Sequence, residues 1–91
     1  MNLQDALFNW LQMKIVSTHR SNDRAAKDTL DFFAEILRED HGLEQFEIEK
    51  RDDEYYEVAI RSKKGTEVKR FDRELADRLL AEIEANPKYN E

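Results

Sequence analysis

Basic side chains gather in one short stretch of the sequence, and such a stretch can bind an anion. Between positions 61 and 70 the chain has five of them, with Glu67 as the only acidic residue in between: Arg61, Lys63, Lys64, Lys69 and Arg70. Lysine and arginine bind phosphate backbones by displacing the counterions around them. The stretch has no aromatic residue between these cations on which a base could stack. Anion or weak nucleic-acid binding by this basic hairpin is therefore our second hypothesis for function.

Histidine and cysteine, which serve in many catalytic and zinc sites, are scarce. The chain has no cysteine and two histidines, His19 and His41, which excludes disulfides, thiolate catalysis and zinc sites built on sulfur. Ser17 and Thr18 precede His19, but a catalytic triad also needs an orienting group and an oxyanion site. Two glycines are too few for a glycine-rich phosphate loop. We predict no catalytic residue, no metal site and no cofactor, and therefore no enzyme.

Three glutamates are expected to meet on one side of a sheet. Glu47, Glu49 and Glu57 share the outer face of the first two predicted strands, and either allowed register puts a glutamate opposite Glu57. A hard cation could bridge such carboxylates. Arg61 and Lys69 are close enough along the strands to offset the charge instead, and we favour that alternative over a metal site.

The first predicted helix, within residues 2–18, has an unusually wide apolar surface. At about 100° per residue its apolar side chains cover well over half of the circumference. Two helices are enough to cover a three-stranded sheet, so part of this surface should stay free. Exposed apolar patches rich in aromatic and methionine side chains are typical of interfaces. The candidate partner-binding residues are Phe8, Trp10, Met13 and Ile15; the alternative is that this helix completes the core.

Two further helices have narrower apolar stripes. The second is expected over 24–41, and Gly42 should end it in a left-handed conformation. The last begins after Asp72 as its N-cap and stops at Asn86-Pro87. Its buried stripe is expected to contain five side chains: Leu75, Ala76, Leu79, Leu80 and Ile83.

Three strands are expected between these helices, with one apolar face toward them. Six side chains make up that inner face: Phe46, Ile48, Tyr56, Val58, Ile60 and Val68. In the first two strands these positions are all even-numbered, so residues paired across the hairpin must have an even sum. A two-residue turn would give an odd sum and place Ile48 and Val58 on opposite faces. We therefore predict a three-residue loop or a bulge within 51–54.

The second hairpin is expected to obey the same rule. Pairing Ile60 with Val68 leaves Lys63-Lys64-Gly65 as a three-residue loop, in which Gly65 adopts a positive φ. Glu67 and Lys69 then lie on the outer, solvated face of the sheet.

The order of these elements defines the fold class and the domain organisation. The chain is predicted to be α+β, in the order α-α-β-β-β-α, with a three-stranded antiparallel meander and its helices packed on one face. Residues 1–91 form a single domain, made of the N-terminal helix at 2–18, an α-β-β-β-α unit at 22–86 and a short tail at 87–91.

From Asn22 onward this order resembles that of double-stranded RNA-binding domains. The resemblance implies RNA contacts from the first helix of the unit, from the loop between its first two strands and from a lysine-rich start of its last helix. Here the loop is Arg51-Asp52-Asp53-Glu54 and the helix begins Phe71-Asp72-Arg73-Glu74. Carboxylates therefore stand where phosphates would bind, and we transfer no RNA-binding residue from the family.

Composition favours a soluble protein that works by binding. The formal net charge is −6, which opposes general attraction to nucleic acid. The start of the chain lacks the basic segment and cleavage site of a signal peptide, and no apolar run is long enough for a membrane span. We predict a cytoplasmic, non-enzymatic protein-interaction or regulatory module. Its partner is another protein or a second copy in a weak homodimer, not a membrane.

Overall fold

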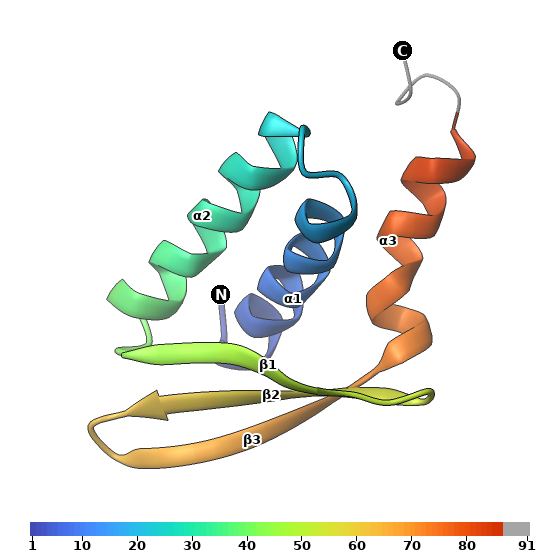
Figure 1. Cartoon of the computed structure of the whole chain (residues 1–91). Helices are drawn as coiled ribbons and strands as arrows, with labels where there is room; N and C mark the ends of the chain where they lie inside the picture. The colour runs from blue at the N-terminus through green and yellow to red at the C-terminus, as the bar shows by residue number, and fades with distance from the viewer. Residues whose placement is uncertain (87–91) are drawn as a thin grey trace.

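The computed structural model describes residues 1–86, so the predicted tail at 87–91 lies outside the described residues. The element order is the predicted one, α-α-β-β-β-α (Figure 1). The bounds are α1 Leu3–His19, α2 Arg24–Glu39, β1 Gln45–Arg51, β2 Tyr55–Ser62, β3 Gly65–Asp72 and α3 Arg73–Ala85.

Each helix begins at a polar N-cap that satisfies a free backbone donor. The N–H of Asp5 donates to Oδ1 of Asn2 (2.7 Å), and Asp23 and Asp72 cap α2 and α3 in the same way. Gly42, with a φ of +64°, follows the end of α2, and the N–H of Leu43 donates to the carbonyl of Leu37 (3.0 Å). The predicted N-cap at Asp72 and the left-handed Gly42 are confirmed.

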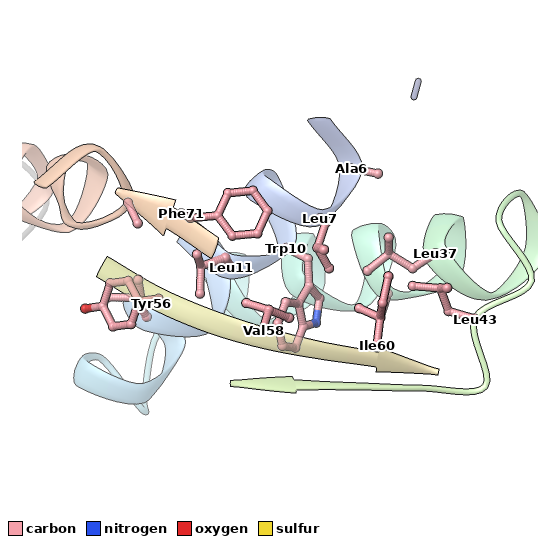
Figure 2. Packing of buried hydrophobic residues seen from close by; sticks show 13 residues of the cluster. Ala6, Leu7, Trp10, Leu11, Leu37, Leu43, Tyr56, Val58, Ile60 and Phe71 are labelled. Carbon is pink, nitrogen blue, oxygen red and sulfur yellow. The ribbon is translucent and has the colours of Figure 1, made fainter. Parts of the chain in front are cut away.

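All three helices lie on one side of the sheet, and α1 lies between α2 and α3 (Figure 1). Side chains of α1 point to the face of β2 that carries Tyr56, Val58 and Ile60 (Figure 2). Within residues 1–86, the first helix supplies six of the fifteen buried apolar residues. The alternative that α1 completes the core beside the other two helices is therefore confirmed, and α2 and α3 alone do not cover the sheet. A helix that is apolar nearly all round contacts a neighbour on every side, and this one contacts the sheet and both other helices.

The first hairpin keeps the predicted faces but places its extra residue elsewhere. Ile48 pairs with Val58 on the inner face, as the parity rule requires. The register shifts between Ile48 and Lys50, so that Glu49 is an extra, bulged residue within β1, outside the predicted range 51–54. The bulge brings Lys50, and not a glutamate, opposite Glu57.

The second hairpin differs from the prediction. Ser62 pairs with Gly65 across a two-residue turn, Ile60 pairs with Glu67, and Val68 pairs with Ala59 on the outer face. Glu67 and Lys69 consequently lie on the inner side of β3, and 48 % of Val68 is exposed. The positive φ of Gly65 is confirmed, at +128°.

The size of one aromatic side chain explains this register. Val68 and Phe71 are three positions apart, so only one of them can point toward the helices. Phe71 is buried and packs on Phe8 of α1, with ring centroids 5.9 Å apart. Because burying phenylalanine removes more apolar area from water than burying valine, the sheet turns Phe71 inward and Val68 outward.

The last helix packs less closely than its sequence predicts. Of its expected buried stripe only Ala76 is fully buried, while Leu79, Leu80 and Ile83 are partly covered and 46 % of Leu75 is exposed. In Figure 1 α3 rises away from the end of β3. The first four residues of β3 are accordingly exposed, on both faces of the sheet.

Candidate functional site

The basic hairpin is not one cationic patch, because alternation along the strands divides its side chains between two faces. On the outer face, Arg61 lies 3.9 Å from Glu44 and Arg70 lies 3.8 Å from Glu57. On the inner side of β3, Nζ of Lys69 lies 3.2 Å from a carboxylate oxygen of Glu67. Three of the five predicted anion-binding cations thus have a carboxylate neighbour within the described chain.

The remaining two, Lys63 and Lys64, form the β2–β3 turn beside a groove. The groove has a volume of about 720 Å³ and lies between the start of α1, the loop after α2 and the hairpin tip. Leu3, Leu43 and Ile60 provide apolar walls, and His41 and the two lysines provide polar ones. Asp40 and Glu67 also line it. The groove therefore offers two lysine ammonium groups next to an apolar surface, with two carboxylates close by to limit the attraction of anions.

The outer face of the sheet contains an aromatic side chain, Tyr55, that contacts two cations. Its position in the sequence does not predict these contacts. The guanidinium of Arg70 stacks on the ring of Tyr55, 4.0 Å from its centroid, and Nζ of Lys50 lies 5.9 Å from the same centroid. Tyr55 is distant from Arg70 in sequence and meets it only because β2 pairs with β3. Tyr55 has an odd number, whereas the inner residues of β2 have even numbers. This parity was the signal in the sequence that places Tyr55 on the outer face. Since Arg70 already covers the ring, a base could stack on it only by displacing the guanidinium.

The end of the sheet away from the hairpin groove carries a hydrogen-bonded cluster of Tyr56, Asp77 and Arg73. The Tyr56 hydroxyl donates to Oδ1 of Asp77 (2.5 Å), and Nε of Arg73 donates to Oδ2 of the same carboxylate (3.2 Å). Arg73 also donates through Nη1 to the carbonyl of Asp52 (2.8 Å), and its backbone N–H donates to the carbonyl of Glu54 (3.0 Å). Burial, followed by the hydrogen bond to Asp77, raises the pKa of Tyr56 to about 12.

This cluster occupies the positions where the resemblance to double-stranded RNA-binding domains implies RNA contacts. The basic group of the helix start, Arg73, binds Asp77 and the backbone of the first hairpin loop. Arg73 thereby links the first hairpin loop to α3.

The predicted partner-binding residues of α1 do not form one free surface. Trp10 is only 5 % exposed and packs edge-on against Phe46 at 5.2 Å, and Ile15 is buried as well. Phe8 and Met13 are partly covered. The expected exposed margin of α1 is therefore absent at Trp10 and Ile15, because α2 and α3 flank the helix on both sides.

The free edge of β3 is a regular, exposed edge of the sheet. The strand order is β1-β2-β3, so β1 and β3 are the two edges. The register of β1 is broken by its bulge, whereas β3 pairs with β2 without a shift over all eight of its residues. A regular, uncovered edge strand is a template for another strand, and bulges are one of the features that prevent such pairing.

The direction of each backbone group on β3 follows from one hydrogen bond. Since the N–H of Arg73 donates to Glu54, and alternate residues of an antiparallel strand bond to the same side, the odd-numbered residues of β3 face β2. The N–H and carbonyl groups of Thr66, Val68 and Arg70 therefore face the free edge. The predicted pairing of Ile60 with Val68 reverses the direction of these groups, so this edge was not predicted from the sequence.

Comparisons with known proteins add no further assignment. No protein-family model, curated protein or solved structure matches the chain. Among residues 1–86 no group of three or more histidine or carboxylate side chains could hold a metal ion. No helix of that part of the chain is long and apolar enough to cross a membrane.

Proposed function

We propose that this protein is a non-enzymatic, cytoplasmic interaction module that binds an extended segment of a polypeptide along the free edge of β3. The observation that carries the proposal is the geometry of this edge, which is regular, exposed and formed by the backbone groups of Thr66, Val68 and Arg70. Strand addition is a common mode of peptide recognition, in which main-chain hydrogen bonds give affinity and alternating side chains give specificity.

Two side-chain features favour selective rather than indiscriminate pairing. Val68 is an exposed apolar residue beside Ala59 on the outer face, and it offers a contact for an apolar side chain of the added strand. Glu67 and Lys69 flank it on the inner side and present opposite charges. A strand with the wrong charge sequence would place like charges opposite each other, which costs binding energy.

A second candidate function is anion binding at the hairpin groove. Lys63 and Lys64 favour it, because these two cations of the basic hairpin have no carboxylate at ion-pair distance within residues 1–86 and lie next to the groove. Phosphate groups, including those of a nucleic acid, are the matching ligand chemistry. Asp40 and Glu67 in the same groove weaken this candidate, and it remains second to strand addition.

Proline at position 68 tests the leading proposal. The N–H of Val68 faces the free edge, so Val68→Pro removes a donor that β2 does not use, and proline is tolerated on edge strands of this kind. Val68→Thr keeps the N–H and is the matched control. In affinity capture from extracts of the cells that express the protein, we expect proteins retained by the wild type and by Val68→Thr to be lost with Val68→Pro.

The same experiment separates the two candidates. Retention through the β3 edge should survive both RNase treatment and the double substitution Lys63→Glu with Lys64→Glu. Retention that disappears after either of these treatments supports anion binding at the groove instead. Capture by Val68→Pro at wild-type level would contradict strand addition.

A further inference from the structure

We propose that the strand added to β3 is β3 of a second copy, antiparallel and centred on Val68, so that two three-stranded sheets join into one six-stranded sheet. The inference rests on the proposed function, because it names the polypeptide that occupies the edge. It differs from the predicted dimer through α1, whose largest side chain, Trp10, lies in the core of one molecule.

The outward backbone groups restrict how two copies of β3 can pair. Thr66, Val68 and Arg70 carry the free N–H and carbonyl groups, so these residues must form the hydrogen-bonded pairs of the new ladder. Directly opposed residues of an antiparallel pair also point to the same face of the sheet. A symmetric pair therefore has an even sum of residue numbers, and successive registers differ by two in this sum.

Charge selects one register from this set. When Val68 lies opposite itself, Glu67 of each copy lies opposite Lys69 of the other, and Thr66 lies opposite Arg70. The next register toward α3 places Lys69 opposite itself, and the next one toward the turn places Glu67 opposite itself. Both neighbouring registers thus put like charges face to face on the symmetry axis, where they destabilise the pair.

The selected register also uses the charges and the apolar surface of the monomer. Lys69 and Glu67 are 3.2 Å apart within one chain, so two copies bring together four charges that alternate in sign. On the outer face, the two Val68 side chains cover each other at the centre of the contact, where each is half exposed in the single molecule. An isologous contact of this kind closes on itself and produces a dimer rather than a fibre.

The steric requirements of this pairing are met along β3. In Figure 1 α3 leaves the sheet at the end of β3 and rises away from it, and the edge of β3 between the β2–β3 turn and that end has no helix beside it. The strand is eight residues long, so the contact falls in the small class of interfaces, below about 1,200 Å² in total. The dimer should accordingly be weak and should form as the concentration rises from micromolar to millimolar.

A single cysteine tests the register, because the natural sequence contains none. Val68→Cys places one thiol on the symmetry axis, opposite its copy, within the Cα separation that a disulfide allows. Thr66→Cys is the matched control on the same strand and face, and in this register it lies about 13 Å from its copy. In a glutathione redox buffer we expect Val68→Cys to form the interchain disulfide at least tenfold faster than Thr66→Cys. Equal rates, or a faster control, would overturn the register.

Charge reversal provides a second test that does not depend on cysteine chemistry. Glu67→Lys and Lys69→Glu each replace two attractive pairs by two repulsive ones, so each variant alone should self-associate at least about tenfold more weakly than the wild type. An equimolar mixture restores opposite charges at all four positions, and light scattering should show mixed dimers at wild-type concentrations. A mixture that stays monomeric, or single variants that associate like the wild type, would contradict the proposal.

Measurements of dimerisation and of protein capture separate self-pairing from strand addition in general. If the wild type stays monomeric at millimolar concentration while captured proteins still depend on the N–H of Val68, the second copy is the wrong occupant and strand addition stands. If the wild type dimerises but Val68→Pro and Val68→Thr dimerise equally well, the β3 edge is not the dimer interface and the self-pairing proposal fails. Strand addition then fails as well only if capture of other proteins is also unchanged in Val68→Pro.

Discussion

Tyr56 joins the core to the polar cluster at the end of the sheet. Its ring is buried on the inner face of β2, and its hydroxyl donates to Asp77. The folded chain raises its pKa from 10.0 to about 12, chiefly because burial disfavours the phenolate. A pKa raised on folding contributes stability that is complete below the unfolded value of 10.0 and is lost as pH rises through about 12.

Replacing this tyrosine should weaken the fold and change its response to alkali. Tyr56→Phe removes a hydrogen bond to a carboxylate and should lower the free energy of unfolding by about 1–3 kcal/mol near neutral pH. The difference from the wild type should shrink as pH rises above about 10, and the phenol that titrates near pH 12 should disappear. Urea unfolding and ultraviolet absorbance titration measure both effects. Tyr55→Phe, on the outer face, is the control, and an equal loss of stability in it would contradict the role of the cluster.

The two glycines adopt different backbone conformations where they connect the helices and strands. Gly42 has a φ of +64°, in the left-handed region that asparagine also tolerates, whereas Gly65 has a φ of +128°, beyond that region. Lys63 and Lys64 both have negative φ. Two-residue hairpins normally require positive φ within the turn itself. In this hairpin the positive φ therefore occurs at Gly65, one residue after the two lysines of the turn.

This difference predicts which substitutions asparagine can rescue. Gly65→Ala should lower the free energy of unfolding by about 1–3 kcal/mol, and Gly65→Asn by nearly as much, because neither side chain suits this φ. At Gly42, alanine should cost about 1 kcal/mol and asparagine distinctly less. A Cβ meets no atom within 4 Å at either position, so these costs come from the backbone alone. Thermal or urea unfolding decides, and full rescue by Gly65→Asn would indicate an ordinary left-handed loop instead.

Helix α1 is the centre of the helical layer. Trp10 and Leu11 reach the sheet, Phe8 contacts Phe71, and the helix touches both α2 and α3 (Figure 2). Thirteen residues from all three helices, two strands and the loop after α2 form one hydrophobic cluster. The α-β-β-β-α unit that starts near Asn22 therefore lacks a large part of its core without the residues before it.

Core position and surface position should separate clearly in mutagenesis. Trp10→Ala should lower the free energy of unfolding by about 3–5 kcal/mol, enough to unfold a domain of ordinary stability. Ile15→Val should cost about 0.5–1.5 kcal/mol and keep the protein folded for measurement. Phe32, which is 58 % exposed on α2, is the control, and Phe32→Ala should change stability by about 0.5 kcal/mol or less. If Trp10→Ala were as mild as Phe32→Ala, α1 would be a free surface after all.

Local patterns in the sequence determined the elements of this protein. The order of helices and strands, the N-cap at Asp72 and the positive φ of both glycines follow from side-chain chemistry within a few residues. The faces of β1 and β2 also follow, because strict alternation of apolar residues leaves one solution. The same alternation correctly predicted an extra residue in the first hairpin. It did not determine where this residue lies, because a bulge at Glu49 restores the faces as well as a longer loop would.

Long-range packing determines which face of β3 is buried and where α1 lies, and neither follows from local sequence patterns. Val68 and Phe71 have opposite parity, and the choice depended on Phe8, a residue far away in sequence that packs on Phe71. The wide apolar surface of α1 fitted both a central helix and an exposed one until the positions of α2 and α3 were known. The candidate site could not be found from sequence for this reason: the direction of each backbone group on β3 depends on its register, and long-range packing sets that register.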